Sequence, residues 1–408
     1  MLGTILRGVA SALLTILAVP AAAAAQPLPV QPVNRAVHTI PIELYGNRVY
    51  LQVSGPGFGP RWFILDSGAQ LTHYTSELVQ EAGLRTSGRV GISGIGSGRI
   101  RGAFVAPTRL SIGSLQLPVR RGVSGPGEEL FGSLYRGIGR RFDGVLGHDL
   151  FAAFIVEIDY SRRVIRLYEP GSYRPSPTAE AVPIRIVDNK PYVTVMVTAA
   201  GQTLPANLHI DTGLGGAADL NSNFVTRHGL LDRVGPMLTG ATGGVGGSVE
   251  SRVARLDQVA FGRLRMQRPV VGLILGHSAG VRGDSEGRIG GELLRRFTVT
   301  FDYPSRTMWL DPGAAVGDPF ETDMSGLSLV AEGSDDKVVV ARVTEGAPGA
   351  EAGVRAGDQL IAIDGDTDAA RSLDTARGLL RRDGEQRELL LQRGAEQLRL
   401  RLTLRRRL

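Results

Sequence analysis

The chain has 408 residues, of which 42% are apolar and 21% are charged, so it is long enough for two or three compact units with buried cores. It contains no cysteine, which excludes disulfides, thiol catalysis and thiolate metal sites. Its 46 basic residues outnumber the 40 acidic ones, but they are scattered singly with few aromatic residues beside them. We therefore interpret the positive excess as solvated surface and expect no nucleic-acid partner.

The N-terminus has the pattern of a secretory signal. Arg7 is the only charged residue among the first 25, Val9–Val19 form a short apolar core, and Ala21–Ala25 supply small residues before Gln26. We expect a signal peptide over residues 1–25 and an exported protein, periplasmic or secreted; the alternative is an uncleaved anchor. No later segment approaches transmembrane length, so no further membrane span is expected.

The middle of the chain contains an internal repeat, which decides the expected fold. The first copy spans residues 37–170 and the second spans 178–312. Corresponding segments are Ile40–Leu44 and Val182–Ile186, Phe63–Gly68 and Leu208–Gly213, Asp143–Gly147 and Glu286–Gly290, and Phe154–Tyr160 and Phe297–Tyr303. Such agreement over several segments predicts two similar lobes related by a pseudo-twofold axis.

Each copy is rich in runs that alternate apolar and polar residues, such as Val49–Val53, and these predict β-strands. Short helices are expected after the Asp-Ser-Gly and Asp-Thr-Gly motifs of the two copies, at Ser76–Ala82 and Asn223–His228. Segments rich in proline, glycine and serine at Pro170–Pro177 and Pro312–Pro319 are typical of linkers. The first would join the two copies, and the second would lead to a separate C-terminal unit over residues 323–408.

Two aspartates occupy the same position in the two copies. Asp66 and Asp211 each follow an apolar run and precede a hydroxyl residue and a glycine. A carboxylate at the end of a buried strand is costly unless it has a role. Two carboxylates in close contact share one proton, so one can take a proton from water while the other polarises a carbonyl group. We therefore predict Asp66 and Asp211 as a catalytic pair that needs neither metal nor cofactor.

These motifs carry a resemblance to a known family. With Asp66-Ser67-Gly68 and Asp211-Thr212-Gly213, each followed by a later segment bounded by two glycines, Gly144–Gly147 and Gly287–Gly290, residues 37–312 resemble the retropepsin-like aspartic proteases with both lobes in one chain. The resemblance implies two β-barrel lobes, a peptide bound extended across the cleft, and Ser67 and Thr212 locking the two loops together, with Gly68 and Gly213 as further loop support. Leu214 departs from the family pattern, which makes the geometry of the second loop less certain.

Two glycine-rich stretches, Gly91–Gly98 and Gly240–Gly247, follow the aspartates at similar distances. In the family, flap hairpins close over the substrate at this place, and the alternative is an ordinary surface hairpin. The pepsin-like flap tyrosine is absent from both. The flap candidates are Gly94, Ile95, Gly96, Gly244, Val245 and Gly246.

The six histidines show no spacing typical of metal ligands, and we interpret each as a lone strand or surface residue.

The C-terminal residues resemble a bacterial-type PDZ domain. Gly346–Pro348, Ala352–Val354 and Ala356–Gly365 carry the resemblance, Ser372–Arg382 would be the helix beside the peptide groove, and Leu398–Leu402 would be the last strand. Gly326, Leu327, Ser328 and Leu329 would form the loop that binds the terminal carboxylate of a peptide. Ser328 replaces the usual second glycine of this loop, and a domain used only for packing is the alternative.

Together these features predict a mainly β protein with two retropepsin-like lobes followed by a small α+β PDZ domain. The predicted function is an aspartic endopeptidase whose PDZ domain binds peptide or protein termini. The alternative is a catalytically inactive scaffold or adaptor with the same fold.

Overall fold

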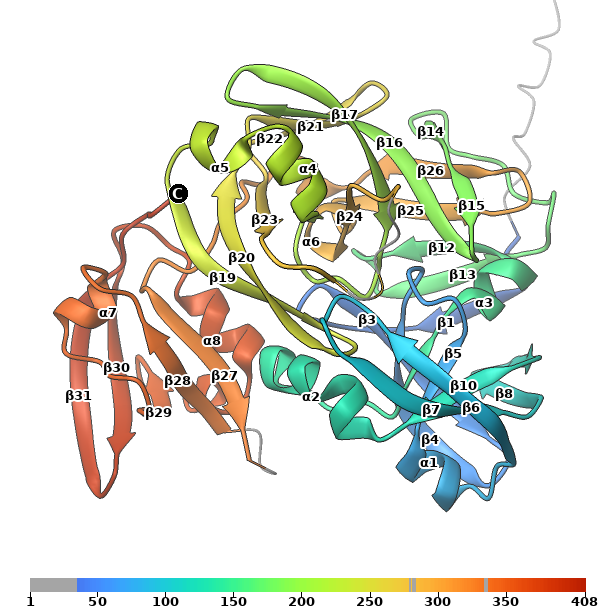
Figure 1. The fold of residues 1–408 in the computed structure, drawn as a ribbon, viewed down its shortest axis with the longest axis horizontal. Helices are drawn as coiled ribbons and strands as arrows, with labels where there is room; N and C mark the ends of the chain where they lie inside the picture. The colour runs from blue at the N-terminus through green and yellow to red at the C-terminus, as the bar shows by residue number, and fades with distance from the viewer. Residues whose placement is uncertain (1–34, 279, 281–283, 334–336) are drawn as a thin grey trace, which may run out of the picture. The chain divides into compact units, whose positions relative to one another are not determined.

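The computed structural model describes residues 35–278, 280, 284–333 and 337–408 (Figure 1). The predicted signal peptide lies outside the described residues. Within the described part, the chain forms three sheets that belong to the repeat and one that belongs to the C-terminal unit. These sheets confirm the predicted fold class.

The N-terminal lobe is built on a sheet to which ten described strands contribute. Along the sheet the order is β6-β7-β10-β5-β11-β4-β3-β8-β9, and β2 pairs with β3. The strands are β2 (Glu43–Tyr45), β3 (Arg48–Gly55), β4 (Phe58–Leu65), β5 (Thr72–Thr75), β6 (Thr86–Ser93), β7 (Arg99–Val105), β8 (Thr108–Ile112), β9 (Leu115–Val119), β10 (Gly122–Gly125) and β11 (Gly144–Leu146).

The C-terminal lobe repeats this topology strand for strand. Its order is β19-β20-β23-β18-β24-β17-β16-β21-β22, and β15 pairs with β16. The strands are β15 (Arg185–Val187), β16 (Lys190–Ala199), β17 (Gln202–Ile210), β18 (Ala218–Leu220), β19 (Met237–Gly244), β20 (Gly247–Arg255), β21 (Gln258–Phe261), β22 (Leu264–Gln267), β23 (Val270–Ile274) and β24 (Gly287–Ile289). The internal repeat in the sequence therefore corresponds to a structural repeat.

A third sheet joins the two lobes, with the order β1-β13-β12-β25-β26-β14 among the described residues. Its strands are β1 (His38–Pro41), β12 (Ile155–Asp159), β13 (Val164–Tyr168), β14 (Glu180–Pro183), β25 (Phe297–Asp302) and β26 (Thr307–Pro312). At its centre β12 pairs antiparallel with β25, so that Val156 lies opposite Phe301 and Ile158 opposite Val299. The closing strands of the two repeats are therefore direct neighbours.

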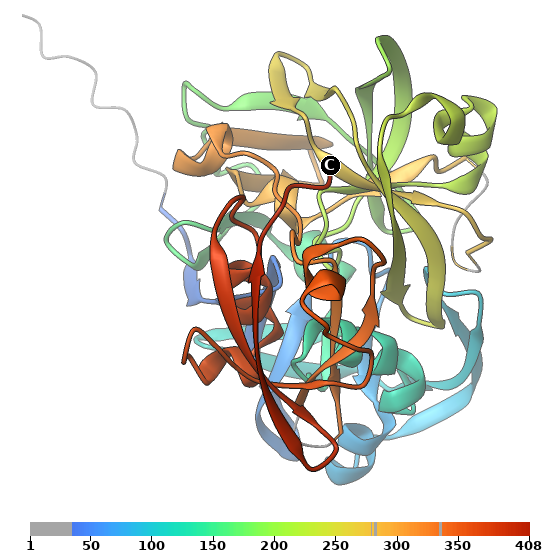
Figure 2. The ribbon, with the colours of Figure 1, turned by 90° about the vertical axis from the view of Figure 1, so that its left-hand side faces the viewer.

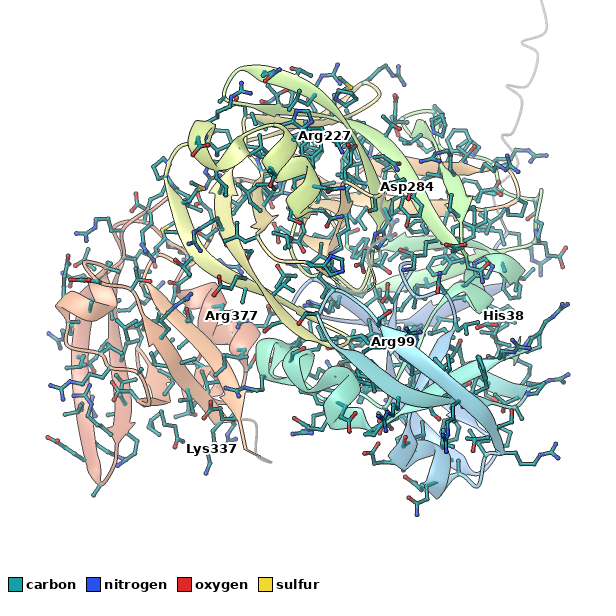
Figure 3. All side chains as sticks on the ribbon, in the orientation of Figure 1. His38, Arg99, Arg227, Asp284, Lys337 and Arg377 are labelled. Carbon is teal, nitrogen blue, oxygen red and sulfur yellow. The ribbon has the colours of Figure 1, made fainter. Side chains whose placement is uncertain are left out.

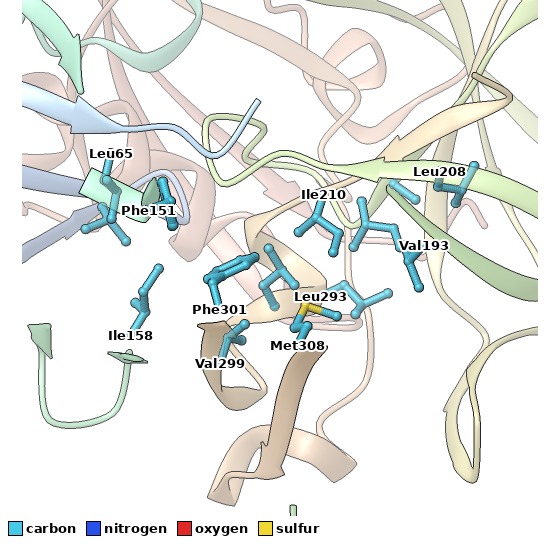
Figure 4. Packing of buried hydrophobic residues seen from close by; sticks show 14 of the residues in the cluster. Leu65, Phe151, Ile158, Val193, Leu208, Ile210, Leu293, Val299, Phe301 and Met308 are labelled. Carbon is cyan, nitrogen blue, oxygen red and sulfur yellow. The ribbon is translucent and has the colours of Figure 1, made fainter. Parts of the chain in front are cut away.

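Apolar side chains from both repeats form one continuous core beside this sheet (Figure 4). Phe151 and Phe301, one from each repeat, meet edge to face with ring centroids 5.2 Å apart. Leu65 and Ile210, the residues that precede the two aspartates, are both fully buried in the same core. Since a fully buried side chain of this size contributes about 1.5–3 kcal/mol, the core holds the two aspartate-bearing strand ends in fixed positions.

Helices connect and cover the strands. They are α1 (Ser76–Glu81), α2 (Gly127–Ile138), α3 (His148–Ala153), α4 (Ser222–Arg227), α5 (Leu230–Arg233), α6 (Gly291–Leu294), α7 (Pro348–Glu351) and α8 (Leu373–Leu379), with the 3-10 turns η1 (Ala314–Gly317) and η2 (Asp368–Ala370). The predicted helices at Ser76–Ala82 and Asn223–His228 correspond to α1 and α4 within one residue. Helix α2 was not predicted.

The C-terminal unit forms a sheet with the order β27-β28-β29-β30-β31, shown in orange to red from two sides in Figures 1 and 2. Its strands are β27 (Leu327–Glu332), β28 (Lys337–Val343), β29 (Gln359–Ile363), β30 (Gln386–Arg393) and β31 (Glu396–Thr403). They enclose a hydrophobic core of their own, in which Leu360, Leu373 and Leu391 are buried. The predicted groove helix and last strand correspond to α8 and β31.

The segment that leads into this unit is held more firmly than a linker usually is. The fully buried Arg296 donates hydrogen bonds to the carbonyl oxygens of Ala315, Asp318 and Pro319, and its guanidinium lies 3.5 Å from the ring centroid of Phe320. The predicted linker Pro312–Pro319 therefore contains a 3-10 turn fixed to the C-terminal lobe. The predicted domain boundaries themselves stay predictions.

Candidate active site

Asp66 and Asp211 lie at equivalent positions, each directly after a buried strand. Asp66 follows β4 and its N–H donates to the carbonyl oxygen of Leu146, at 2.9 Å; Asp211 follows β17 and donates in the same way to Ile289, also at 2.9 Å. Leu146 lies on β11, in the Gly-apolar-apolar-Gly segment of the N-terminal lobe. Ile289 lies on β24, in the corresponding Gly-Arg-Ile-Gly segment of the C-terminal lobe. The repeat therefore presents the two carboxyl groups by the same local construction.

The turn after each aspartate is also the same in both lobes. The N–H of Ala69 donates to the carbonyl oxygen of Asp66 at 3.2 Å, and the N–H of Leu214 donates to that of Asp211 at 3.1 Å. Leu214 was the departure that made the second loop uncertain. Its backbone adopts the same turn, so this substitution does not alter the loop.

Ser67 and Thr212 connect the two loops by crossed hydrogen bonds. Ser67 Oγ donates to the carbonyl oxygen of Ile210 at 2.7 Å, and Thr212 Oγ1 donates to that of Leu65 at 2.8 Å. Each hydroxyl oxygen also accepts from the backbone N–H of the opposite residue, at 3.0 Å for Ser67 N and 3.2 Å for Thr212 N. Ser67 and Thr212 are 0% and 1% exposed, so water does not compete for these four bonds.

Gly68 and Gly213 leave the space in which the carboxyl groups approach each other. A β-carbon on Gly213 would lie 2.7 Å from the carboxyl carbon of Asp66, and one on Gly68 would lie 3.2 Å from that of Asp211. A side chain at Gly213 would therefore push Asp66 away. The structure brings together all six predicted residues of the two loops, and four of them, Asp66, Gly68, Asp211 and Gly213, line one cleft.

The cleft has a volume of about 250 Å³ and is covered by the two glycine-rich stretches. The first forms the hairpin of β6 and β7, the second forms the hairpin of β19 and β20, and both tips line the cleft. Gly96 N–H donates to the carbonyl oxygen of Val245 at 3.1 Å, so the tips touch each other. A β-carbon on Gly96 would lie 2.1 Å from the carbonyl carbon of Gly246, so a residue with a side chain does not fit at this position.

The two carboxyl groups differ in their surroundings. Burial, together with the negative charge of Asp211, raises the pKa of Asp66 to about 8, although Gly68 N–H donates to its carboxyl oxygen at 2.7 Å. Burial would also raise the pKa of Asp211, but His209 and Arg288 hold it below its ordinary value. Close carboxyl groups with separated pKa values are suited to acid and base roles at one pH.

The sequence analysis assigned no role in the site to three of the residues around Asp211. Arg288 Nη1 donates to Asp211 Oδ2 at 2.9 Å and Arg288 Nη2 to Asp219 Oδ2 at 2.7 Å, while His209 Nε2 lies 3.6 Å from Asp211 Oδ2. The interpretation of every histidine as a lone strand or surface residue is therefore wrong for His209. The expectation that the basic residues are solvated is wrong for Arg288, which is 9% exposed, and for Arg296.

Helix α2 contributes a further wall of the cleft. Phe131 and Leu134 line the cleft, and Ser133 Oγ donates to the carbonyl oxygen of Gly244 in the second flap at 2.9 Å. The helix begins after Pro126 and ends at Gly139, whose φ of 75° is the left-handed conformation typical of a residue that ends a helix. Its proline, its two early glutamates and its final glycine are the signals that could have predicted it.

In the C-terminal unit, two backbone N–H groups of the predicted carboxylate-binding loop already have partners within the chain. Gly326 N–H donates to Asp323 Oδ1 at 2.7 Å, and Leu327 N–H donates to Ser325 Oγ at 3.1 Å. Leu327 is 6% exposed and belongs to the core of the domain, and with Ser328 and Leu329 it also lines a groove. The carboxylate of Asp323 thus lies where the loop was expected to hold a ligand carboxylate.

The other two loop residues contact arginines. Ser328 Oγ accepts from Arg342 at 3.3 Å. Arg377 of helix α8, labelled in Figure 3, donates to the carbonyl oxygen of Leu329 at 2.7 Å and so joins α8 to β27. Helix α8 is the element that was expected to lie beside the peptide groove, and β27 begins within the predicted carboxylate-binding loop.

Within residues 35–278, 280, 284–333 and 337–408, no helix combines the length and the apolar character needed to cross a membrane.

Comparisons with known proteins give matches among solved structures and among family models. Among solved structures, the chain is similar to the crystal structure of aspartic proteinase from Irpex lacteus, with 13% sequence identity, 69% of this chain and 98% of that chain covered, and a TM-score of 0.44. No curated protein matches the sequence. A family model described as a PDZ domain matches residues 339–393. The chain therefore carries the predicted PDZ domain, which follows the two-lobed β part described above.

Proposed function

We propose that the protein is an aspartic endopeptidase in which Asp66 and Asp211 activate a water molecule. The observation that carries this proposal is the pair of matching loops, fixed to each other by the four buried hydrogen bonds of Ser67 and Thr212 beneath a covered cleft. A rigid frame of this kind supports catalysis because both carboxyl groups are already in place before the substrate binds.

The reaction follows from one proton shared by two carboxyl groups. The ionised carboxylate takes a proton from the water, whose oxygen forms a bond to the scissile carbonyl carbon. The protonated carboxyl group gives its proton to the carbonyl oxygen, so a tetrahedral diol forms. When the diol collapses, the carbon–nitrogen bond breaks and the leaving nitrogen takes a proton from the carboxyl group that gained one. At the same time the other carboxylate takes a proton from a hydroxyl group of the diol, so the new carboxylic acid forms and the pair again holds one proton. Asp66 and Asp211 supply these groups without a metal or a cofactor.

The proposed substrates are peptides or proteins bound in an extended conformation across the cleft. Ile95 and Val245 from the two flap tips, with Phe131 and Leu134 from α2, give the cleft apolar walls. These walls favour a substrate with large apolar side chains around the scissile bond. The flap hairpins would exclude bulk water from the reacting groups.

We further propose that the protein is exported, to the periplasm or beyond, and that the PDZ domain recruits protein termini to the protease. Recruitment raises the local substrate concentration without changing the chemistry. It therefore predicts that a competing C-terminal peptide slows the cleavage of protein substrates but not that of short peptides. Equal effects on both kinds of substrate would argue against recruitment.

The decisive experiment is the incubation of the mature protein with a diverse peptide library between pH 3 and pH 10, with the products identified by mass spectrometry. Asp66→Asn or Asp211→Asn should each remove nearly all cleavage, and the double variant should add little because the two groups act as a unit. Thr194→Val, an exposed substitution on β16, is the control. Activity should survive a chelator and decline above about pH 8, where Asp66 loses its proton.

Substantial turnover by a folded single variant would refute the carboxylate pair. Peptide binding without cleavage by the wild-type protein would instead favour the inactive scaffold.

A further inference from the structure

The two lobes differ at one register position beside the catalytic loops. In the N-terminal lobe, β11 places Val145 opposite Ile64, which lies two residues before the first aspartate. In the C-terminal lobe, the same position of β24 is Arg288, opposite His209. At this equivalent position the N-terminal lobe therefore has an apolar pair, whereas the C-terminal lobe has a basic pair.

Arg288 contacts two buried carboxylates at once. Its Nη1 donates to Asp211 Oδ2 at 2.9 Å, while its Nε and Nη2 donate to Asp219 Oδ2 at 3.2 Å and 2.7 Å. Arg288 is 9% exposed, Asp219 is 4% and Asp211 is 6%. Since a planar guanidinium directs its N–H groups rigidly, the two bonds to Asp219 orient the third toward Asp211.

Asp66 has no comparable partner among the described residues. Its carboxyl oxygen accepts the N–H of Gly68 at 2.7 Å, and no ion pair with a basic side chain is formed there. The charged and titratable groups that face Asp211 are Arg48 of β3, Asp66, Lys190 of β16, His209 of β17, Asp219 of β18 and Arg288 of β24. Of the basic groups in this set, Arg288 and His209 are those within 4 Å of an Asp211 oxygen.

We propose that Arg288, oriented by Asp219, is a positioning residue that keeps Asp211 ionised and thereby makes Asp66 the carboxyl group that carries the shared proton. The inference rests on the proposed function and adds that each of the two aspartates has one fixed role. Asp211 takes the proton from the water, and Asp66 gives its proton to the scissile carbonyl oxygen. A symmetric pair could exchange these roles, whereas this pair cannot.

The directions of the pKa shifts agree with this geometry. Burial and the charge of Asp211 raise the pKa of Asp66, whereas His209 and Arg288 lower that of Asp211 against the effect of burial. Burial lowers the pKa of His209 in spite of Asp211, so the persistent positive charge next to Asp211 is that of Arg288.

The test compares the dependence of kcat/KM on pH in the wild type and in Arg288→Met. Removing the cation disfavours ionisation of both carboxyl groups, so the acidic limb should move to higher pH by about 1–3 units and the alkaline limb should move in the same direction. Arg288→Lys should restore part of the shift because it keeps the charge without the two-carboxylate geometry. Arg227→Met, which removes an exposed arginine labelled in Figure 3, should leave both limbs unchanged.

Two additions keep the test decisive. Arg288→Met leaves Asp219 buried without its partner, so Arg288→Met/Asp219→Asn provides a second variant that avoids an unpaired charge. The ¹³C NMR signals of the carboxyl carbons, assigned through Asp66→Asn and Asp211→Asn, report ionisation without turnover. In the wild type we expect Asp211 to stay ionised to a lower pH than Asp66. In Arg288→Met and in Arg288→Met/Asp219→Asn we expect Asp211 to titrate at higher pH than in the wild type.

An unchanged titration of Asp211 in folded Arg288 variants would overturn the inference and leave the proposed protease function intact. Cleavage that persists in Asp66→Asn would remove the proposed function, whatever the NMR titration shows.

Discussion

The crossed hydrogen bonds between the catalytic loops allow a quantitative test that does not depend on activity. Thr212→Val replaces the hydroxyl by a methyl group of similar size, so it removes the bond from Thr212 Oγ1 to the Leu65 carbonyl and the bond from Ser67 N–H to Thr212 Oγ1. The carbonyl oxygen of Leu65 and the N–H of Ser67 then lose these hydrogen bonds in a site from which water is excluded. The substitution therefore isolates the hydrogen bonds from the packing.

The expected magnitude follows from the two groups left without a partner. A buried donor or acceptor that loses its hydrogen bond costs about 1–3 kcal/mol, so the two together cost about 2–6 kcal/mol. Part of this cost is offset because the new methyl group, unlike the hydroxyl group that it replaces, needs no hydrogen-bond partner when it is buried. We therefore expect Thr212→Val to lower the free energy of unfolding by about 2–4 kcal/mol, in the range of the large effects of single substitutions.

The measurement is chemical unfolding followed by circular dichroism, with Thr194→Val as the matched control. Thr194 is exposed on β16 of the same lobe, so the same change there should alter the stability by less than about 0.5 kcal/mol. Because Ser67 and Thr212 share one network, Ser67→Ala combined with Thr212→Val should cost less than the sum of the two single changes. Equal stability of Thr212→Val and Thr194→Val would refute the reasoning.

Two further predictions concern the flaps and the PDZ domain. Gly96→Ala should lower kcat/KM by on the order of 10- to 100-fold, because a β-carbon 2.1 Å from the carbonyl carbon of Gly246 forces the tips apart; Gly59→Ala, where nothing lies within 4 Å, should leave it unchanged. Asp323→Ala should free the N–H of Gly326 and tighten the binding of peptides with a free terminal carboxylate, but not of amidated ones, in fluorescence anisotropy. Unaltered cleavage by Gly96→Ala, or an equal change for both peptide forms, would contradict these interpretations.

Much of the fold could be predicted because the information is local and occurs twice. Period-2 alternation specifies strands, and glycine after each aspartate specifies a tight turn, so each motif can be interpreted from a few neighbouring residues. The repeat then supplies what a single motif lacks. A second copy in register implies a pseudo-twofold axis, and such an axis brings Asp66 and Asp211 to one place although 145 residues separate them.

The sequence by itself therefore determined the class of fold, the aspartate pair as a candidate site and the PDZ domain. Tertiary structure alone decided the surroundings of the pair. His209, Asp219 and Arg288 come from three strands whose adjacency depends on the strand order of the sheet, and no sequence pattern indicated that these side chains meet at Asp211. Likewise, the carboxylate of Asp323 accepts the N–H of Gly326 in the predicted carboxylate-binding loop only because the backbone turns back there. Contacts of this kind depend on which distant segments become neighbours and in which register, and the local pattern of one segment does not identify its partner.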